Sequence, residues 1–333
     1  MKQTSRNSPA NRGTLQFGSF TLHVDDNDIA LLKIDGPEKV NLISVGVLDD
    51  LSAVLDHLES RTDIKGLVLY SGKDSFIAGA DIKDIVKAQQ LDPQIAFAAS
   101  QEGKAVFARL SALPFKSVAA IHGRCLGGGM ELALACTYRL ATDDESTLLG
   151  LPEVALGVIP GWGGTTRTGQ IIGLENAAKL ILDPMKPWAA RKAWRLGLVS
   201  EVVPKEHLLA RAVFMARRGY PGSYKPKAKE RFQRFVFESF LGRAIFRVVA
   251  RQQIQKKTGG KYPALFAALD VLLASFRLCP TRAAELESQT FANLCHTPES
   301  KEAVQTFLNR KTAAITKTAA GEYRAKDENE PKS

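Results

Sequence analysis

The sequence is organised around one stretch, Ser117-Val-Ala-Ala-Ile-His-Gly-Arg-Cys-Leu-Gly-Gly-Gly-Met-Glu-Leu-Ala-Leu-Ala-Cys136. Its first apolar residues, Val118 to Ile121, predict a short buried strand, and the glycines at 127–129 interrupt that pattern just before an apolar helical one. Glycines at a strand-to-helix turn let the backbone approach a ligand closely, and they leave N–H groups at the helix N-terminus for an anion or a developing oxyanion. The stretch therefore predicts an anion-stabilising turn.

Two glutamates accompany this turn. Glu131 falls in the first turn of the predicted helix, where a negative charge is also favourable for purely structural reasons. Glu153 stands between Pro152 and an apolar run, and burial there would raise its pKa toward the range that suits proton transfer. The second glutamate favours general acid–base chemistry over a structural charge at a helix start.

Three blocks of the chain belong together: Phe76-Ile-Ala-Gly-Ala-Asp-Ile82, Ile121-His-Gly-Arg-Cys-Leu-Gly-Gly-Gly-Met-Glu131, and Leu151-Pro-Glu-Val with Ile159-Pro-Gly-Trp-Gly-Gly-Thr165. In this order and spacing they resemble the crotonase (enoyl-CoA hydratase/isomerase) superfamily, and specifically the hydratase half of the multifunctional fatty-acid oxidation alpha subunits. The resemblance implies an α/β fold, the crotonase spiral of strand-strand-helix repeats, followed by a helical C-terminal extension. It reaches nearly to Thr312, because segments 256–264 and 297–303 are similar to the alpha-subunit linker.

The resemblance implies hydration of trans-2-enoyl-CoA to 3-hydroxyacyl-CoA in fatty-acid β-oxidation, with coenzyme A as part of the substrate and no separate cofactor. Such a reaction pushes negative charge onto the thioester oxygen, so it needs two fixed donors in a dry site. The implied site residues are catalytic Glu131 and Glu153, the oxyanion-hole N–H groups of Ala80 and Gly128, and a CoA-binding backbone at Ala78, Ala80, Asp81 and Ile82. Asp81 is expected to cap the following helix whatever the function.

Two other functions stay open, a crotonase-fold isomerase or other acyl-CoA enzyme, and a non-catalytic assembly subunit. Two glutamates favour hydration, because moving a double bond needs one shuttling base, whereas adding water needs one group for the nucleophile and one for the α-carbon proton. A silent subunit would have lost site residues, and none is lost. The segment 163–170 departs from the family pattern, which leaves the acyl pocket near Trp162 undecided.

Composition narrows the partners. The 333 residues carry a net charge of +10, which favours an anionic partner such as the phosphates of coenzyme A over specific nucleic-acid binding. The four cysteines lie far apart, and the histidines are scattered, so neither a disulfide framework nor a metal site is expected. His122 is expected to be a buried, hydrogen-bonded histidine rather than a catalytic one.

The chain divides into four segments by pattern: a disordered tail at 1–13, the hydratase core at 14–216, the helical extension at 217–312, and a second disordered tail at 313–333. No run of residues is long and apolar enough for a membrane span. We expect a cytoplasmic protein, with an organelle matrix less favoured. No Gly-x-Gly-x-x-Gly fingerprint occurs, so the dehydrogenase half of the alpha subunits is expected to be absent.

The extension is basic and amphipathic. Its lysines and arginines are expected to form a solvated face, and Phe232, Phe235 and Phe237 a buried helix stripe. Helices are predicted over Pro263–Phe276 and Pro280–Leu294. We expect an apolar face with Leu265, Leu269, Leu272 and Phe276 to dock a separately encoded 3-hydroxyacyl-CoA dehydrogenase, and a thiolase with it. Folding back over the chain's own active site, or a homotrimer contact, remain as alternatives.

Overall fold

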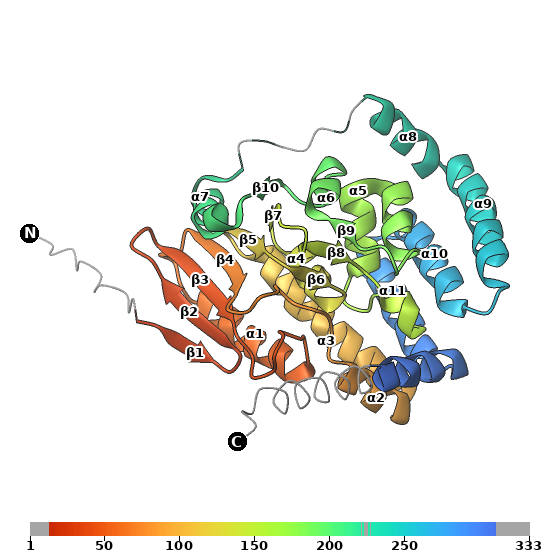
Figure 1. Ribbon diagram of the computed structural model, residues 1–333, viewed down its shortest axis with the longest axis horizontal. Coiled ribbons are helices and arrows are strands. Elements are labelled where there is room, and N and C mark those ends of the chain that lie inside the picture. The colour runs from red at the N-terminus through yellow and green to blue at the C-terminus, as the bar shows by residue number, and fades with distance from the viewer. Residues whose placement is uncertain (1–12, 221, 223–225, 227, 311–333) are drawn as a thin grey trace, which may run out of the picture.

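A computed structural model describes residues 13–220, 222, 226 and 228–310 (Figure 1). The tails expected at 1–13 and 313–333 lie outside the described residues, apart from Gly13. The described chain is an α/β fold with helices on both faces of a mixed sheet and a C-terminal helical extension, as the sequence predicts.

The main sheet has seven strands in the order β1-β2-β3-β4-β5-β7-β10. The first three strands are antiparallel and the rest pair in parallel. A parallel strand covered on both faces is apolar almost throughout, and this explains the continuous apolar runs of the central strands. The strands are β1 (Leu15–Phe17), β2 (Phe20–Val24), β3 (Ile29–Ile34), β4 (Gly66–Ser71), β5 (Lys116–Ile121), β7 (Tyr138–Thr142) and β10 (Glu201–Val203).

A second sheet has three short strands in the order β6-β8-β9, and it is connected to the first through the turn at Gly123. Strand β5 ends at Ile121, and β6 (Arg124–Leu126) begins three residues later, after Gly123 with φ of 58°. A Cβ at Gly123 would lie 2.5 Å from the Asp74 carbonyl oxygen, so both the conformation and the close approach require glycine. The other two strands are β8 (Leu148–Gly150) and β9 (Trp188–Ala189).

Helices surround both sheets (Figure 1). They are α1 (Val45–Glu59), α2 (Ile82–Gln90), α3 (Pro93–Ala112), α4 (Gly128–Ala135), α5 (Gly164–Ile181), α6 (Ala190–Arg195), α7 (Leu208–Arg218), α8 (Ala228–Glu238), α9 (Phe240–Thr258), α10 (Pro263–Ser275) and α11 (Pro280–Cys295), with short 3-10 turns η1 (Glu153–Leu156) and η2 (Lys205–His207) and a further helix over 298–310.

Sequence spacing predicts several of these helices well. Leu48, Leu51, Leu55 and Leu58 recur three and four residues apart, which predicts a helix between Ser44 and Ser60 with one buried face. Helix α1 begins after Ser44, whose side chain accepts a hydrogen bond from the Val47 N–H, and all four leucines are buried. The helices predicted over Pro263–Phe276 and Pro280–Leu294 are α10 and α11 with nearly the same ends.

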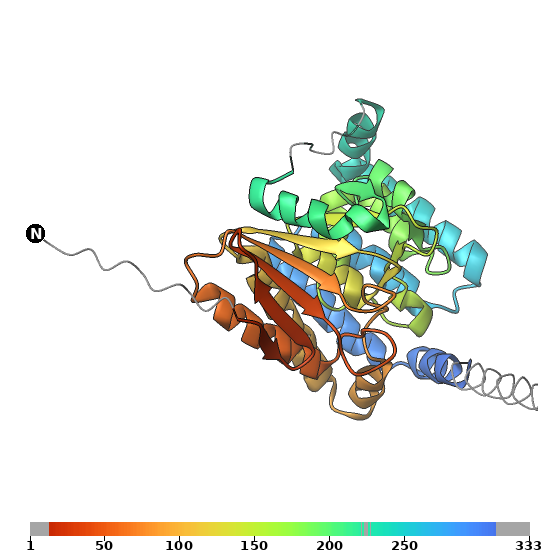
Figure 2. The ribbon, with the colours of Figure 1, turned by 60° about the vertical axis from the view of Figure 1, so that its left-hand side comes forward.

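The two faces of the main sheet are covered by different helices (Figure 2). Helix α7 packs on β4, β5 and β7 through Leu208, Ala212 and Met215. The opposite face packs against α1 and the layer of α3 and α4 in the larger core. This larger core continues into the extension, since it includes Leu269 and Leu272 of α10.

The helical extension folds back on the same chain. Helix α10 packs on α5, α11 packs along α3, and the helix over 298–310 packs on α2 through Val304. The apolar face of α10 that we expected to dock a partner is therefore buried: Leu269 and Leu272 have no exposed surface, and Phe276 and Leu272 approach Gly169 of α5. The α10 face is therefore wrong as the docking surface, because the extension folds back over the chain's own core and covers it, while the docking of a partner elsewhere stays a prediction.

The aromatic stripe of α8 is also different from the prediction. Phe237 is partly buried and contacts Phe246 with ring centroids 5.9 Å apart, but Phe232 and Phe235 are 67% and 77% exposed. Figure 1 shows the reason: α8 and α9 lie at the edge of the molecule, so each has only one side covered. The solvated basic face holds for Arg231, Arg247, Lys256 and Lys257, which are exposed, whereas the predicted Lys225 and Lys227 lie outside the described residues.

Candidate active site

The loop from Phe76 to Asp81 is held in place by a buried asparagine. The side chain of Asn41 donates hydrogen bonds to the Ile34 and Phe76 carbonyl oxygens and to Ser71, and its amide oxygen accepts from the Gly36 N–H at 3.1 Å. The backbone carbonyl oxygen of Asn41 accepts from the Ala78 N–H at 2.9 Å. Because an amide side chain supplies two donors and an acceptor, one buried residue can join the end of β3, the end of β4 and this loop. The loop conformation is thus fixed from behind.

Of the four residues expected to bind coenzyme A, Ala78, Ala80 and Asp81 lie in this loop, and Ile82 is the first residue of α2. Ala78 and Ala80 are partly exposed. Asp81 caps α2 by accepting a hydrogen bond from the Lys83 N–H at 3.0 Å, which confirms the predicted cap. The side chain of Ile82 is 7% exposed and packs with Ile85 and Val304. Any contact of Ile82 with coenzyme A therefore falls to its backbone.

The glycine turn brings the first turn of α4 close to this loop. Gly127 has φ of 52° and precedes the helix, and a Cβ at Gly128 would lie 3.5 Å from the Ala80 nitrogen. Among the residues that the structure describes, neither the Ala80 nor the Gly128 N–H donates a hydrogen bond outside its own element. Two uncommitted backbone donors thus meet beside a helix N-terminus.

Glu131 lies one turn into α4 and is almost fully buried, with 2% of its surface exposed. Its Oε1 accepts hydrogen bonds from the Trp162 N–H at 2.7 Å and the Gly164 N–H at 2.8 Å. Burial raises the pKa of Glu131 to about 7, and the nearby charge of Glu287 adds to this effect, while the two N–H donors and Lys104 oppose it. Such a carboxyl exchanges protons near neutral pH.

Glu153 opens η1 on the opposite side of the glycine turn. Neither of its buried carboxyl oxygens has a hydrogen-bond partner among the described residues, and a Cβ at Gly127 would lie 3.3 Å from Oε1. Burial raises the pKa of Glu153 well above its ordinary value, and the charge of Glu131 raises it further. A buried polar group left without partners in a folded protein points to a functional role.

The turn η1 is fixed by the C-terminal helix. It ends at Gly157, whose φ is 73°, and a Cβ there would lie 2.6 Å from Cα of Ser300. Ser300 in turn donates a hydrogen bond to the Leu156 carbonyl oxygen at 3.1 Å. The extension therefore packs directly behind the segment that carries Glu153.

Trp162 borders the site from the other side. Its ring lies between two glycines, since a Cβ at Gly103 would lie 2.5 Å from the indole and a Cβ at Gly128 2.6 Å from it. The ring of Phe107 packs edge-on at 6.0 Å between centroids. Two glycines on neighbouring helices thus make room for one large ring against the turn that carries the Gly128 N–H.

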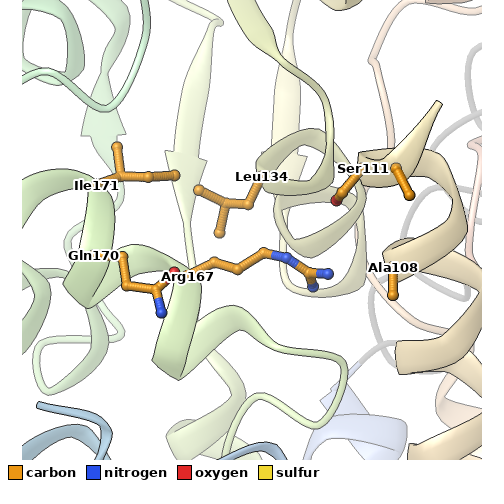
Figure 3. A pocket seen from close by; sticks show the side chains of 7 residues that line it. Ala108, Ser111, Leu134, Arg167, Gln170 and Ile171 are labelled. Atoms are coloured by element: carbon orange, nitrogen blue, oxygen red, sulfur yellow. The ribbon is translucent and has the colours of Figure 1, made fainter. Parts of the chain in front are cut away.

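A surface pocket lies farther along the same helices, between α3, α4 and α5 (Figure 3). Arg167 extends across it, with Leu134, Gln170 and Ser111 around its side chain. The guanidinium also donates a hydrogen bond to the Trp162 carbonyl oxygen at 2.9 Å. Arg167 therefore both lines this pocket and bonds to the backbone of Trp162 at the candidate site.

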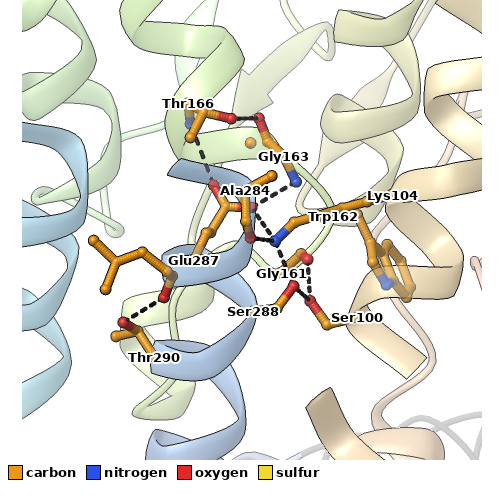
Figure 4. Close-up of polar contacts among 12 residues, drawn as sticks. Ser100, Lys104, Gly161, Trp162, Gly163, Thr166, Ala284, Glu287, Ser288 and Thr290 are labelled. Atoms are coloured by element: carbon orange, nitrogen blue, oxygen red, sulfur yellow. Dashed lines mark hydrogen bonds and ion pairs between the residues drawn. The ribbon is translucent and has the colours of Figure 1, made fainter. Parts of the chain in front are cut away.

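The structure adds two charged residues that sequence analysis missed, Lys104 of α3 and Glu287 of α11. Both are buried, and their Nζ and Oε1 atoms lie 3.3 Å apart beside the 161–166 turn (Figure 4). The available signal was a charge at an apolar helix position: Glu287 stands four residues from Ala283 and from Phe291, which both face inward.

Other candidates stay outside this site. The Nε2 atom of His122 lies 2.6 Å from the Lys73 carbonyl oxygen, so the expected hydrogen bond is present, but the residue is partly exposed rather than buried as expected. All four cysteines are free, and Cys279 is exposed while the other three are buried. Within the described residues no cluster of His, Cys, Asp and Glu could hold a metal ion, and no described helix is long and apolar enough to cross a membrane.

Solved structures with a similar fold carry several activities in their names. An enoyl-CoA hydratase from Bacillus anthracis is 23% identical with a TM-score of 0.54, covering 88% of this chain and 96% of its own. An enoyl-CoA hydratase/isomerase from Xanthobacter autotrophicus Py2 is 23% identical with a TM-score of 0.57, covering 87% and 97%. A carnitinyl-CoA dehydratase from Mycobacterium thermoresistibile is 21% identical with a TM-score of 0.62, covering 87% and 89%.

At this level of identity the three structures show the fold alone. The family follows from the sequence itself, because residues 25–236, more than half of the chain, match the enoyl-CoA hydratase/isomerase family. This protein belongs to that family, and so to the crotonase superfamily.

Proposed function

We propose that the protein is an enoyl-CoA hydratase, a hydro-lyase that adds water to trans-2-enoyl-CoA and forms 3-hydroxyacyl-CoA in fatty-acid β-oxidation. One observation carries the proposal: two buried carboxyl groups, Glu131 and Glu153, flank the turn where the Ala80 and Gly128 N–H groups meet. The resemblance to the hydratase half of alpha subunits agrees with this activity and remains a prediction.

The thioester oxygen of the substrate would lie between the Ala80 and Gly128 N–H groups. Charge develops on this oxygen as water attacks C3, so donors already oriented toward it stabilise the transition state more than the substrate. Loss of one such donor typically raises the barrier by about 3–4 kcal/mol. The positive end of α4 acts in the same direction.

The two glutamates would take opposite roles in proton transfer. Glu131 uses Oε1 to accept the Trp162 and Gly164 N–H groups, which leaves Oε2 to take a proton from the attacking water. The water oxygen bonds to C3, and the protonated carboxyl of Glu153 gives its proton to C2 as the enolate collapses. Burial raises the pKa of Glu153 well above its ordinary value, which favours the protonated form that this role needs.

Coenzyme A would bind along the loop that carries Ala80. The Ala78 N–H is already bonded to Asn41, so the Ala78 carbonyl oxygen is the group offered to the adenine amino group. The net charge of +10 favours the phosphates of the carrier. Coenzyme A thus enters as part of the substrate.

The main alternative is an isomerase or another acyl-CoA enzyme of the same fold. A fold shared with a carnitinyl-CoA dehydratase shows that related structures carry other substrates. Two carboxyl groups at one turn favour hydration, because a double-bond shift needs only one shuttling base. A non-catalytic assembly subunit has no need to keep either carboxyl group buried beside paired donors.

The test is a panel of CoA thioesters, assayed by loss of enoyl absorbance, with 3-enoyl thioesters included. We expect hydration of crotonyl-CoA, and we expect Glu131→Gln and Glu153→Gln each to lower kcat by about 10²–10⁴-fold, since each removes one proton-transfer group. Glu145→Gln, at an exposed carboxylate, is the matched control. If both site variants hydrate crotonyl-CoA at nearly the wild-type rate, or only 3-enoyl thioesters react, the proposal is wrong.

A further inference from the structure

A buried ion pair lies where α3, α11 and the start of α5 meet (Figure 4). The ammonium of Lys104 is 3.3 Å from Glu287 Oε1, and it donates hydrogen bonds to the Ala284 carbonyl oxygen at 2.5 Å and to Ser288 Oγ at 2.6 Å. Ser100 Oγ lies 2.8 Å from Ser288 Oγ and donates to the Gly161 carbonyl oxygen. The pair is therefore joined at both ends to the loop that holds Glu131.

Glu287 and Glu131 divide the N–H groups of this one loop between them. Trp162 and Gly164 donate to Glu131 at 2.7 and 2.8 Å. Gly163 and Thr166 donate to Glu287 at 2.7 and 3.2 Å. Because the donors alternate along the chain, a shift of Glu287 changes the direction of the N–H groups that hold Glu131.

Stability alone is a poor explanation for this arrangement. Two charges taken out of water often add nothing over apolar side chains of the same size, and a buried ion pair is weak evidence for a stabilising role. The charged groups that face Glu131 are Glu153 from η1, Glu287 from α11, Lys104 from α3 and Arg167 from α5. The electrostatic potential at Glu131 therefore depends in part on Glu287 of the extension.

We propose that Lys104 and Glu287 are a positioning pair that orients the 161–166 turn and balances the charge on Glu131 during turnover. This inference rests on the proposed hydratase function. Neither side chain is assigned contact with substrate. The pair gives the C-terminal extension a task in the reaction, because Glu287 of α11 accepts hydrogen bonds from the Gly163 and Thr166 N–H groups of the loop.

The two members of the pair should act on Glu131 in opposite directions. Loss of the Glu287 charge removes a repulsion and leaves Lys104 nearby, so Glu131 ionises more easily. Loss of the Lys104 charge leaves Glu287 uncompensated, so Glu131 ionises less easily. Since Glu131 must be ionised to accept a proton, the acidic limb of the kcat/KM profile reports its state.

The experiment measures crotonyl-CoA hydration against pH for the wild type, Glu287→Gln, Lys104→Met and the double variant. We expect the acidic limb to move down by about half to one pH unit in Glu287→Gln and up by a similar amount in Lys104→Met. In the double variant it should return toward the wild type, because no net charge is left in the pair. We expect each single variant to lower kcat about tenfold with little change in KM, since the loop acts on the transition state.

Matched controls separate charge from packing. Glu285→Gln makes the same change at an exposed position on α11, and Lys116→Met does so at an exposed lysine. Neither should move the limb. Lys104→Arg keeps the charge, so the acidic limb should lie at its wild-type pH even if kcat is lower. If Lys104→Met does not fold, the downward shift in Glu287→Gln against Glu285→Gln still carries the test.

Failure of the pair differs from failure of the proposed function. A wild type with no activity on the CoA panel overturns both. An active wild type whose two single variants move the limb in the same direction, or leave it in place while losing activity, overturns the pair alone. If the acidic limb moves as far in Lys104→Arg as in Lys104→Met, the proposed pair is also contradicted, because the charge would then not be the cause of the shift.

Discussion

Glu131 holds an ionisable group in a place that disfavours its charge. Burial raises the pKa of Glu131 from an ordinary value near 4.5 to about 7. A carboxyl whose pKa is raised in the folded state contributes stability below its unfolded pKa, and this contribution is lost as pH rises through the folded pKa. The residue that suits proton transfer therefore makes the fold less stable at neutral and alkaline pH.

Glu131→Gln should remove this dependence on pH. The amide keeps the volume and an acceptor for the Trp162 and Gly164 N–H groups, but it carries no charge. We expect the free energy of unfolding of the variant, relative to the wild type, to increase between about pH 5 and pH 8. Urea unfolding at both pH values measures it, with Glu145→Gln as the exposed control. An equal difference at both pH values would show that Glu131 titrates normally.

The sequence leaves the acyl pocket near Trp162 undecided, and the position of Trp162 in the structure makes it a candidate wall of that pocket. Its ring lies against Gly128, beside the proposed thioester position. Trp162→Leu removes part of this wall, so we expect kcat/KM for a ten-carbon 2-enoyl-CoA, relative to crotonyl-CoA, to rise about tenfold. The half-exposed Trp194 supplies the control variant Trp194→Leu. An unchanged ratio of the two substrates would place the acyl chain elsewhere.

Residues that share a continuous motif could be predicted from the sequence, and residues brought together by packing could not. Glu131 and Gly128 stand in one glycine-rich turn, and Glu153 stands beside Pro152 in a second motif. Lys104 and Glu287 come from helices far apart in the chain, and a charge at an apolar helix position does not tell which residue will face it. Only the packing of α11 along α3 makes them a pair.

At the scale of elements, the 76–81 loop depends on a residue outside it. Asn41 is 1% exposed, and its side chain donates hydrogen bonds to the Ile34 and Phe76 carbonyl oxygens. Its backbone carbonyl oxygen accepts from the Ala78 N–H of the loop. A loop with few apolar side chains keeps one conformation only if its polar groups are bonded. The Ala80 N–H is therefore aimed by hydrogen bonds that begin at Asn41.

Asn41→Ala should release this loop. It leaves buried acceptors without donors, which typically costs about 1–3 kcal/mol for each such group, so we expect a clear loss of stability. We also expect kcat to fall more than KM rises, because the oxyanion donor loses its direction before coenzyme A loses its backbone contacts. Steady-state kinetics and urea unfolding test both effects. Asn293→Ala, at an exposed position, should leave both unchanged, and a pure KM effect in Asn41→Ala would contradict the argument.

The periodicity of the sequence predicts which residues form the apolar face of a helix, but not which element packs against that face. For α1 and α10 the predicted face is the buried one. Helix α9 has apolar side chains on two sides: Ala250 and Ile254 face the core, while Leu241, Ile245 and Val248 are more than half exposed. A sequence pattern cannot decide between two apolar faces when the helix lies at the edge of the molecule, and the stripe on α8 failed for the same reason.

At the scale of the molecule, binding of a partner remains a proposal, but the surface proposed for it has to change. A separately encoded 3-hydroxyacyl-CoA dehydrogenase or thiolase cannot dock on the α10 face, which the chain itself covers. The exposed apolar side chains of α8 and α9, among them Phe235 and Leu241, offer such a partner or a second copy another surface of the extension. Co-purification of NAD-dependent dehydrogenase activity from native extract would support docking, and a monodisperse homo-oligomer with hydratase activity alone would contradict it.

The extension and the hydratase core should unfold together. Leu269 and Leu272 of α10 belong to the same buried cluster as the sheet. Ser300 supports the turn that carries Glu153, and Glu287 supports the 161–166 turn whose N–H groups donate to Glu131. If these contacts hold the extension, no stable core remains without it, and unfolding is one cooperative step. All three tryptophans precede residue 217, so their fluorescence reports the core, whereas far-ultraviolet circular dichroism reports all helices.

We therefore expect the two signals to change at the same urea concentration. Leu272→Ala, which removes a fully buried side chain from α10, should lower the free energy of unfolding by about 2–5 kcal/mol and shift both signals equally. Leu241→Ala changes the same residue type at a site that is 67% exposed, and it should shift neither. A dichroism change that precedes the fluorescence change, with Leu272→Ala moving the first alone, would show that the extension is an independent unit.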